Sequence, residues 1–268
     1  MRPFTQGGAE AAPRLPAGAG ARRYGHRVTT AAVGEATTGG LPTPTGSDAL
    51  WTVVGGMGGM VAGLVVGAVP ALLVGGPGYV AIGVATAAAG GAGGLWAALV
   101  RRRGWGLREL GFVRGARSLW HLLWEVPAAL TAGLLATVST GALLGLAPDE
   151  GGGSDDSVLT STFLAAPWSL VVAVVCVVLI VPAVEEVVFR RVLLGWVRTR
   201  VPTPVAVLLV SGVFGALHVV PTAVLYLFFL GVSAALLFLW HRSLWAPFAL
   251  HAANNALASL VGVLALTT

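Results

Sequence analysis

The sequence contains no lysine, a single cysteine and few charges of either sign. Its 16 basic residues are all arginine, and only 10% of the 268 residues are charged, whereas 56% are hydrophobic. Because about a quarter of the residues of an ordinary soluble domain are charged, this composition argues against a water-soluble enzyme. The lone Cys176 excludes an internal disulfide framework and a cysteine-based metal site. The arginines are too dispersed to form a nucleic-acid-binding patch, despite a net charge of +5.

Five long stretches of the sequence contain no charged residue, and they indicate transmembrane helices. A bilayer core about 30 Å thick is crossed by roughly 20 apolar residues in a helix. The first and fourth stretches are long enough for two crossings each, with turns expected at residues 75–78 and near Pro221. We therefore predict an all-α membrane bundle of about seven transmembrane helices. The uncharged stretches are residues 49–100, 126–148, 157–184, 201–241 and 243–268.

The distribution of arginine predicts the orientation of this bundle. Arginines follow the second, fourth and sixth predicted spans, whereas the charged residues of the connection after the third are all acidic. The positive-inside rule then places the N-terminus inside and the C-terminus outside. A composition without lysine and rich in alanine and glycine is typical of a GC-rich bacterial gene. We expect a multi-pass protein of a bacterial plasma membrane.

The remaining segments divide the chain into four parts. Residues 1–48 are rich in Gly, Ala, Pro and Thr and are predicted to be a disordered cytoplasmic tail. Residues 49–147 contain the N-terminal transmembrane helices, and within them residues 105–124 alternate charge with Trp and Leu, as an interfacial amphipathic helix does. Residues 148–165 are predicted to form an external acidic loop, and residues 165–262 form the last part, which holds the polar residues of the later spans.

Glycine recurs every fourth residue along the first predicted span. Gly55, Gly59, Gly63 and Gly67 share one helix face and allow another helix to approach closely. The face could form a dimer contact or pack inside the bundle. We favour packing inside the bundle, because faces of small residues are common in membrane helices.

Ionisable residues in the later spans are costly and mark function by default, at about 2.5–3.5 kcal/mol each on insertion scales. Glu186 and Arg190 are four residues apart in the favourable order for an ion pair. Glu185 would point about 100° away from Glu186 and remain free to face a cavity. Pro182 cannot donate to the carbonyl of Val178, so a kink is expected just before the two acids.

Two further groups of polar residues lie on the last predicted spans. His218 stands alone on its helix with Phe214 one turn away, and His251 and Asn255 share a helix face. Taken singly, the two glutamates with Arg190 could be a solvated helix end, and His218 could be a packing residue. Asn255 and its neighbour Asn254 could be interhelical amides. Together they are the parts of a hydrolytic site, in which Glu and His activate water and His and Asn stabilise an oxyanion.

The three motifs, in this order, resemble the signatures of the CPBP intramembrane proteases, the CAAX protease and bacteriocin-processing family that includes the Rce1-like CAAX prenyl endopeptidases. The motifs are Glu-Glu-x-x-x-Arg at 185–190, Phe-x-x-x-His at 214–218 and His-x-x-x-Asn at 251–255. Each motif alone is weak, but three in order on consecutive apolar segments are specific. The resemblance covers roughly residues 165–262.

The resemblance implies a role for each residue. Glu185 would be the base and His218 its partner on the attacking water, while His251 and Asn255 would stabilise the tetrahedral intermediate. Zinc is the alternative, held by Glu185, His218 and His251 with an open fourth position. Because the chain has no His-Glu-x-x-His motif, we expect no obligatory metal. The supporting residues would be Glu186, Arg190 and Phe214.

These observations predict an intramembrane endopeptidase that acts on a membrane protein or a lipid-anchored peptide within the bilayer, with no nucleic-acid partner. A non-catalytic bacteriocin-immunity or scaffold protein on the same fold is the first rival. A proton-coupled transporter is the second, disfavoured because the spans of the first half hold no ionisable residue. The sequence leaves the substrate and the oligomeric state open.

Overall fold

The computed structural model describes residues 40–74, 79–146, 167–218 and 221–265. Most of the predicted tail, the turn at residues 75–78 and the acidic loop at residues 148–165 lie outside these ranges. The described residues belong to a compact unit that begins at Leu41. Every described element of this unit is helical, as the sequence predicted.

The described helices form seven continuous runs. The first joins α1 (Gly46–Thr52), a π-helical turn (Val53–Met57) and α2 (Gly58–Val74), and the second joins α3 (Tyr79–Leu95) to a π-helical end (Trp96–Arg101). The third is α4 (Leu122–Leu143), preceded by a 3-10 turn (Leu119–His121). The fourth run joins α6 (Pro167–Val175), a π-helix (Cys176–Ile180), α7 (Val181–Glu186), a second π-helix (Val187–Leu193) and α8 (Leu194–Val197). The last three are α9 (Thr203–Ala216), α10 (Pro221–His241) and α11 (Trp245–Ala265).

Five of these runs are long and apolar enough to cross a membrane. The α9 helix has 14 residues and spans about 21 Å at 1.5 Å per residue, less than a bilayer core. The break expected near Pro221 is present, because α10 begins at that proline. The five candidate spans are Gly46–Pro70, Tyr79–Arg101, Leu119–Leu143, Trp168–Val197 and Ala223–His241.

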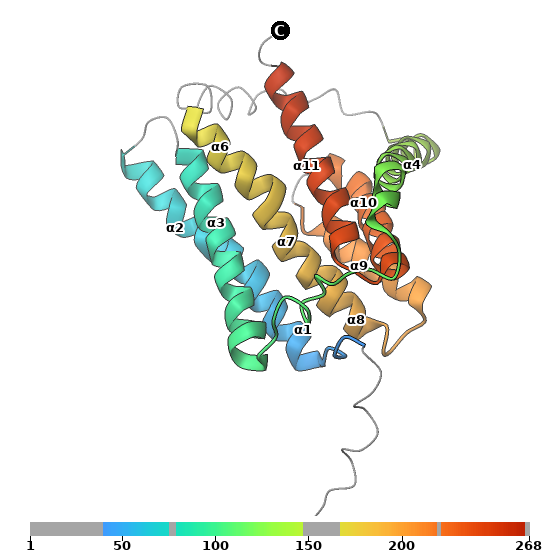
Figure 1. Cartoon of the computed structure of the whole chain (residues 1–268). Helices are drawn as coiled ribbons and strands as arrows, with labels where there is room; N and C mark the ends of the chain where they lie inside the picture. Colours follow the sequence, from blue (N-terminus) through green and yellow to red (C-terminus); the bar gives the residue numbers. More distant parts are fainter. Residues whose placement is uncertain (1–39, 75–78, 147–166, 219–220, 266–268) are drawn as a thin grey trace, which may run out of the picture. The chain divides into compact units, whose positions relative to one another are not determined.

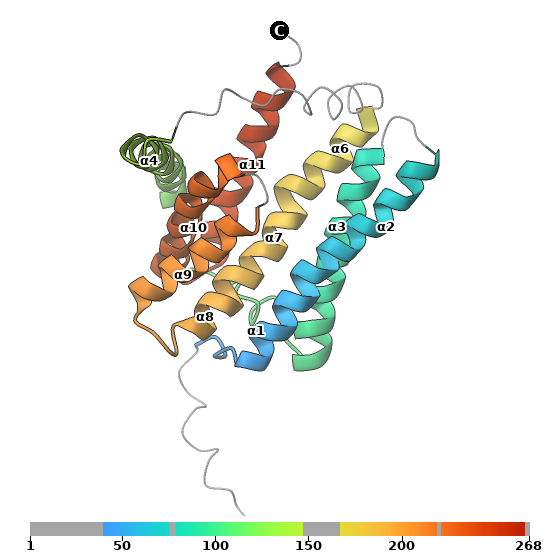
Figure 2. The same ribbon diagram turned by 180° about the vertical axis from the view of Figure 1, so that it is seen from behind.

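The long central run separates two groups of helices (Figure 1). On one side α2 and α3 lie against each other, and on the other α9, α10 and α11 gather, with α4 at the outer edge (Figure 2). The start of α1 and the ends of α3 and α8 lie at one end of this unit, and α11 finishes at the other (Figure 1). That first end carries Arg101, Arg198 and Arg200. The orientation of this end toward the cell interior stays a prediction.

The glycine face of the first run packs inside the bundle. A Cβ atom on Gly59 would lie 2.3 Å from the Gly90 carbonyl oxygen of α3, and one on Gly63 would lie 2.0 Å from the Thr86 carbonyl oxygen. Contacts this short leave no room for any side chain, so the two backbones meet directly. The preferred interpretation, packing within the bundle, is confirmed for this face.

The first helix begins earlier than the predicted limit of the tail at residue 48. Thr45 caps α1 in a capping box with Asp48. The Asp48 carboxylate is buried and pairs with Arg102 at 2.9 Å and Arg103 at 3.1 Å. These interactions place Asp48, the last residue of the predicted tail, within the helical bundle.

The amphipathic helix predicted for residues 105–124 is wrong over most of its length. Residues 104–118 are turns and bends, and helix resumes only at Leu119. Gly104 and Gly111 have φ values of +67° and +100°, which a right-handed helix does not contain. The backbone here forms local turns and also bonds to the α10–α11 turn: Ala116 donates to the His241 carbonyl, and Leu244 donates to the Gly111 carbonyl.

Candidate active site

The central run carries both motif carboxylates well inside its length. Glu185 and Glu186 end α7, and π-helical turns lie on either side of that short helix. Helix continues to Val197, past the residue at which the predicted span ended. Glu185 is therefore about 18 Å from that end of the run.

Two arginines expected in a cytoplasmic loop are buried instead. The exposed fractions of Arg190 and Arg191 are only 2% and 4%. Arg191 donates to the backbone carbonyls of Glu109 at 2.7 Å and Pro42 at 2.6 Å, and its guanidinium lies over the Trp105 ring. Because carbonyl dipoles and an aromatic face solvate this cation, it tolerates burial.

Glu186 is held by two cationic or polar partners. The Arg190 Nη1 atom lies 3.1 Å from Glu186 Oε1, which is the predicted i,i+4 pair. The same oxygen lies 2.9 Å from His251 Nδ1. The Arg190 guanidinium also lies over the Phe214 ring, 4.4 Å from its centroid. Glu186 is thereby fixed by α7, α9 and α11 together.

Glu185 faces the other nitrogen of the same imidazole. His251 Nε2 lies 3.5 Å from Glu185 Oε2, beyond ordinary hydrogen-bond length. The sequence predicted that the two carboxylates diverge, yet both approach His251. Glu185 is nevertheless the less committed of the two, because Glu186 holds both a histidine and an arginine. Both carboxylates are buried, with exposed fractions of 5% and 0%.

His218 lies just beyond the end of α9, not within the helix. Its backbone N–H donates to the Gly215 carbonyl, and its ring Nδ1 lies 2.8 Å from the Phe214 carbonyl oxygen. Because a carbonyl only accepts, Nδ1 carries the proton, and in the neutral ring Nε2 keeps its lone pair. The side chain thus fixes its own tautomer.

Phe214 separates the two motif histidines. Its ring is fully buried and packs edge-to-face on His218 at 4.9 Å and on His251 at 5.7 Å. Phe189 packs against it from the central run at 5.2 Å. Phe214 thereby brings residues of the second and third motifs to one place and excludes water between them.

Asn255 reaches the central run from α11. Its Nδ2 atom donates to the Val177 carbonyl at 2.8 Å, and its Oδ1 atom accepts from Asn254 at 3.1 Å. An amide carries two N–H donors, so this arrangement commits one of them to Val177. The oxyanion role expected for Asn255 stays a prediction that requires the second.

Two imidazoles and a carboxylate are donors that zinc accepts. Glu186 also supports His251 through Nδ1, as outer-shell carboxylates support ligating histidines. However, the described ranges contain no group of three or more His, Cys, Asp or Glu side chains placed to hold a metal ion. Catalysis without a metal stays a prediction, and we derive no step through a metal.

A second buried acid–histidine pair was not predicted from the sequence. His241 Nε2 lies 2.6 Å from Glu125 Oε2, and this contact joins α10 to α4. Glu125 lies just before one uncharged stretch and His241 ends another, and counting charges gave neither residue a role. An isolated acid or histidine beside an apolar run was the available signal.

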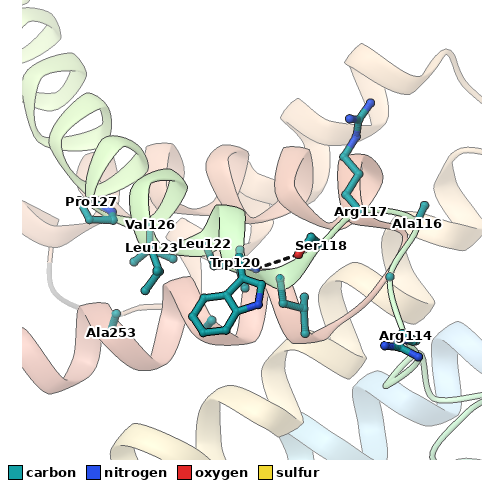
Figure 3. Close-up of a pocket in the computed structure, with 13 residues that line it drawn as sticks. Arg114, Ala116, Arg117, Ser118, Trp120, Leu122, Leu123, Val126, Pro127 and Ala253 are labelled. Carbon is teal, nitrogen blue, oxygen red and sulfur yellow. Dashed lines mark hydrogen bonds between the residues drawn. The ribbon is translucent and has the colours of Figure 1, made fainter.

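A cavity of about 980 Å³ lies between α4, α11 and residues 114–118 (Figure 3). Ala249 and Ala253 of α11 line it. At 100° per residue, His251 points roughly 200° away from each of them. The cavity is therefore on the face of α11 opposite the motif residues and is separate from the candidate site.

Comparison with known families supports the resemblance. Residues 167–257 match the family model described as "Type II CAAX prenyl endopeptidase Rce1-like", and this match contains all three motifs. Comparisons with curated proteins and with solved structures found no match. The family predicted from the motifs is thus confirmed over this segment of the chain.

Proposed function

We propose, from the premise that residues 167–257 form an Rce1-like domain, that the protein is an intramembrane endopeptidase. It would hydrolyse a peptide bond of a membrane-associated protein or peptide. The observation that carries this proposal is the pair of buried carboxylates on one imidazole, Glu185 and Glu186 on His251. Such groups are costly in an apolar helix, and only one of the two acids is needed to neutralise Arg190.

The charges of this cluster balance in the resting state that we propose. Glu185, Glu186, Arg190 and protonated His251 together have no net charge, which a medium of low dielectric favours. In that state His251 donates Nδ1–H to Glu186 and directs Nε2–H toward Glu185. Glu186 and Arg190 then hold the histidine in place and do not take part in proton transfer.

Water attack would use Glu185 and His218. Glu185 accepts a proton as the water oxygen bonds to the scissile carbonyl carbon, and the carbonyl π electrons move to its oxygen. The Nε2 lone pair of His218 orients this water by accepting its other hydrogen. Glu185 later returns the proton to the leaving amine, which breaks the C–N bond and restores the carboxylate.

His251 and Asn255 would stabilise the negative charge that develops on the carbonyl oxygen. Each has an N–H suited to this purpose: Nε2–H of the imidazolium and the Nδ2–H that Val177 does not use. Donors fixed in a water-poor site stabilise an oxyanion without reorganising. Protonation of Glu185 and formation of the oxyanion occur together, so the total charge of the site stays constant.

A matched pair of histidine variants tests this function. The purified protein, reconstituted in lipid, is assayed for cleavage of a membrane-anchored reporter. We expect His218→Gln to reduce the rate by about 10²–10⁴-fold, the usual contribution of acid–base groups. The exposed His121, at the start of α4, serves as the control, and His121→Gln should retain full activity.

The outcome separates the proposal from its two rivals. Equal cleavage by the wild type and a well-folded His218→Gln variant would contradict the mechanism. A wild type that cleaves no reporter but confers bacteriocin immunity would favour the scaffold role. Proton-coupled solute uptake by vesicles containing the protein would favour a transporter.

Chelation tests the alternative of zinc catalysis. We expect the protein to retain peptidase activity after prolonged chelation and to contain less than one equivalent of zinc. Stoichiometric zinc, with activity lost on chelation and restored by the metal, would contradict the glutamate–water mechanism.

A further inference from the structure

A chain of three hydrogen bonds runs from α10 through α11 to the helix that bears Glu185. The Tyr226 hydroxyl donates to Asn254 Oδ1 at 2.6 Å, and Asn254 Nδ2 donates to Asn255 Oδ1 at 3.1 Å. Asn255 Nδ2 then donates to the Val177 carbonyl at 2.8 Å. All donors point in the same direction along the chain.

The chain of hydrogen bonds ends at the Val177 carbonyl, which needs a donor from outside its own helix. Val177 lies in the π-helical turn Cys176–Ile180. In a π-helix each backbone carbonyl accepts a hydrogen bond from the N–H of the residue five positions later. That residue is Pro182, which has no N–H. The Val177 carbonyl is thus left without its helical donor, and the Asn255 amide supplies one in its place.

The direction of the chain fixes the orientation of the Asn255 amide. If the amide were flipped, Oδ1 would face the Val177 carbonyl, and two acceptors would meet at hydrogen-bond distance. Asn254 opposes the same flip, because its own Oδ1 is taken by the Tyr226 hydroxyl and its Nδ2 must donate onward. The second N–H of Asn255 therefore keeps one direction.

We propose that Tyr226 and Asn254 are positioning residues for Asn255 in the peptidase reaction. This inference rests on the proposed function, in which the second N–H of Asn255 stabilises the oxyanion. Tyr226 has no role in bond making or breaking in this proposal. It acts by holding Asn254, which holds Asn255, so its contribution exists only while Asn255 is present.

The test measures reporter cleavage and thermal unfolding of Tyr226→Phe in two backgrounds. Loss of one hydrogen bond in such a chain is expected to lower kcat about tenfold, with KM and Tm nearly unchanged. In the Asn255→Ala background, Tyr226→Phe should have no further effect on kcat. The control is Tyr79→Phe, which removes a phenolic hydroxyl from α3, outside this chain of hydrogen bonds, and should leave kcat unchanged.

A second variant cuts the chain at another link. Asn254→Ala should lower kcat by a similar factor, and adding Tyr226→Phe to it should lower kcat no further. Equal effects of Tyr226→Phe with and without Asn255, or a loss of kcat that only follows a lower Tm, would overturn the proposal. In either case the wild type still cleaves and the proposed function stands. Absence of cleavage by the wild type would overturn both.

Discussion

The two halves of the protein are held together by opposite means. In residues 46–101 the helices meet where side chains are missing: a Cβ atom on Gly94 would lie 1.7 Å from the Gly55 carbonyl oxygen. In residues 167–265 the helices meet around buried ionisable groups, Glu185, Glu186 and Arg190 among them. Lipid provides no hydrophobic drive between helices, so close backbone contact is an inexpensive way to join them. Buried charge is an expensive way to join helices, and the two adjacent buried carboxylates, Glu185 and Glu186, both belong to the second half.

The buried carboxylate of the first half sharpens this contrast. Asp48 lies near a helix start, where it completes a capping box and meets two arginines that are more than a third exposed. All of these partners serve to neutralise it. Glu185 differs because its nearest charged partner, His251, is shared with Glu186. The cluster in the second half has two carboxylates for one arginine, whereas the cluster in the first half has one carboxylate for two arginines.

The largest expected loss of stability comes from removing the structural acid of the site. Glu186→Gln leaves Arg190 buried without its counter-charge, which costs about 3–5 kcal/mol for a broken buried pair. The measurement is thermal unfolding in detergent, with Glu109→Gln as the control. Glu109 is only partly buried; its side chain accepts a local backbone N–H and has a charge interaction with Arg191, so its variant should lose far less stability than Glu186→Gln. Equal unfolding of Glu186→Gln and the wild type would show that the pair is not structural.

The next effect concerns Asn255. Asn255→Ala removes one oxyanion donor and should lower the cleavage rate by about 10²–10³-fold. It also leaves the Val177 carbonyl unsatisfied, which is expected to cost about 1–3 kcal/mol of stability. The control is Ser259→Ala. Ser259 lies one turn after Asn255, and its hydroxyl donates to the Asn255 backbone carbonyl. A rate loss no larger than that of the control would remove Asn255 from the mechanism.

The smallest expected effect is on stability, from alanine substitutions at two adjacent glycines of α3 that test the close helix packing. Gly94→Ala places its Cβ against the backbone of Gly55 and should destabilise the protein by about 1–3 kcal/mol, the usual cost of overpacking. Gly93→Ala meets nothing within 4 Å and should be neutral or slightly stabilising, because alanine favours helix more than glycine. Both are compared by thermal unfolding and by cleavage per folded molecule. Similar behaviour of the two variants would contradict the close contact.

Residue spacing was enough to predict the all-helical bundle and the local ion pair of the site. Uncharged stretches revealed the helices, and the four-residue separation of Glu186 and Arg190 gave a pair that the structure contains. Three motifs in order predicted the family over the segment that matches it. These features depend on local periodicity, which one sequence displays.

Contacts between distant segments were beyond such reasoning. The burial of Arg191 depends on the backbone carbonyls of Glu109 and Pro42, neither of which is near it in sequence. The depth of Glu185 depends on a central helix that continues through π-helical turns to Val197. An ideal helix of 3.6 residues per turn cannot anticipate those turns, and spacing alone did not show that both carboxylates would lie against one imidazole of another helix.

The most direct test of the catalytic claim is the cleavage rate of Glu185→Gln at matched amounts of folded protein. This change keeps the size of the side chain and removes the base, so the account predicts a wild-type melting temperature and no detectable turnover. It thereby separates Glu185, whose loss should affect only the reaction, from Glu186, whose loss should affect the fold. A well-folded Glu185→Gln protein that still cleaves the membrane-anchored reporter at the wild-type rate would contradict the account.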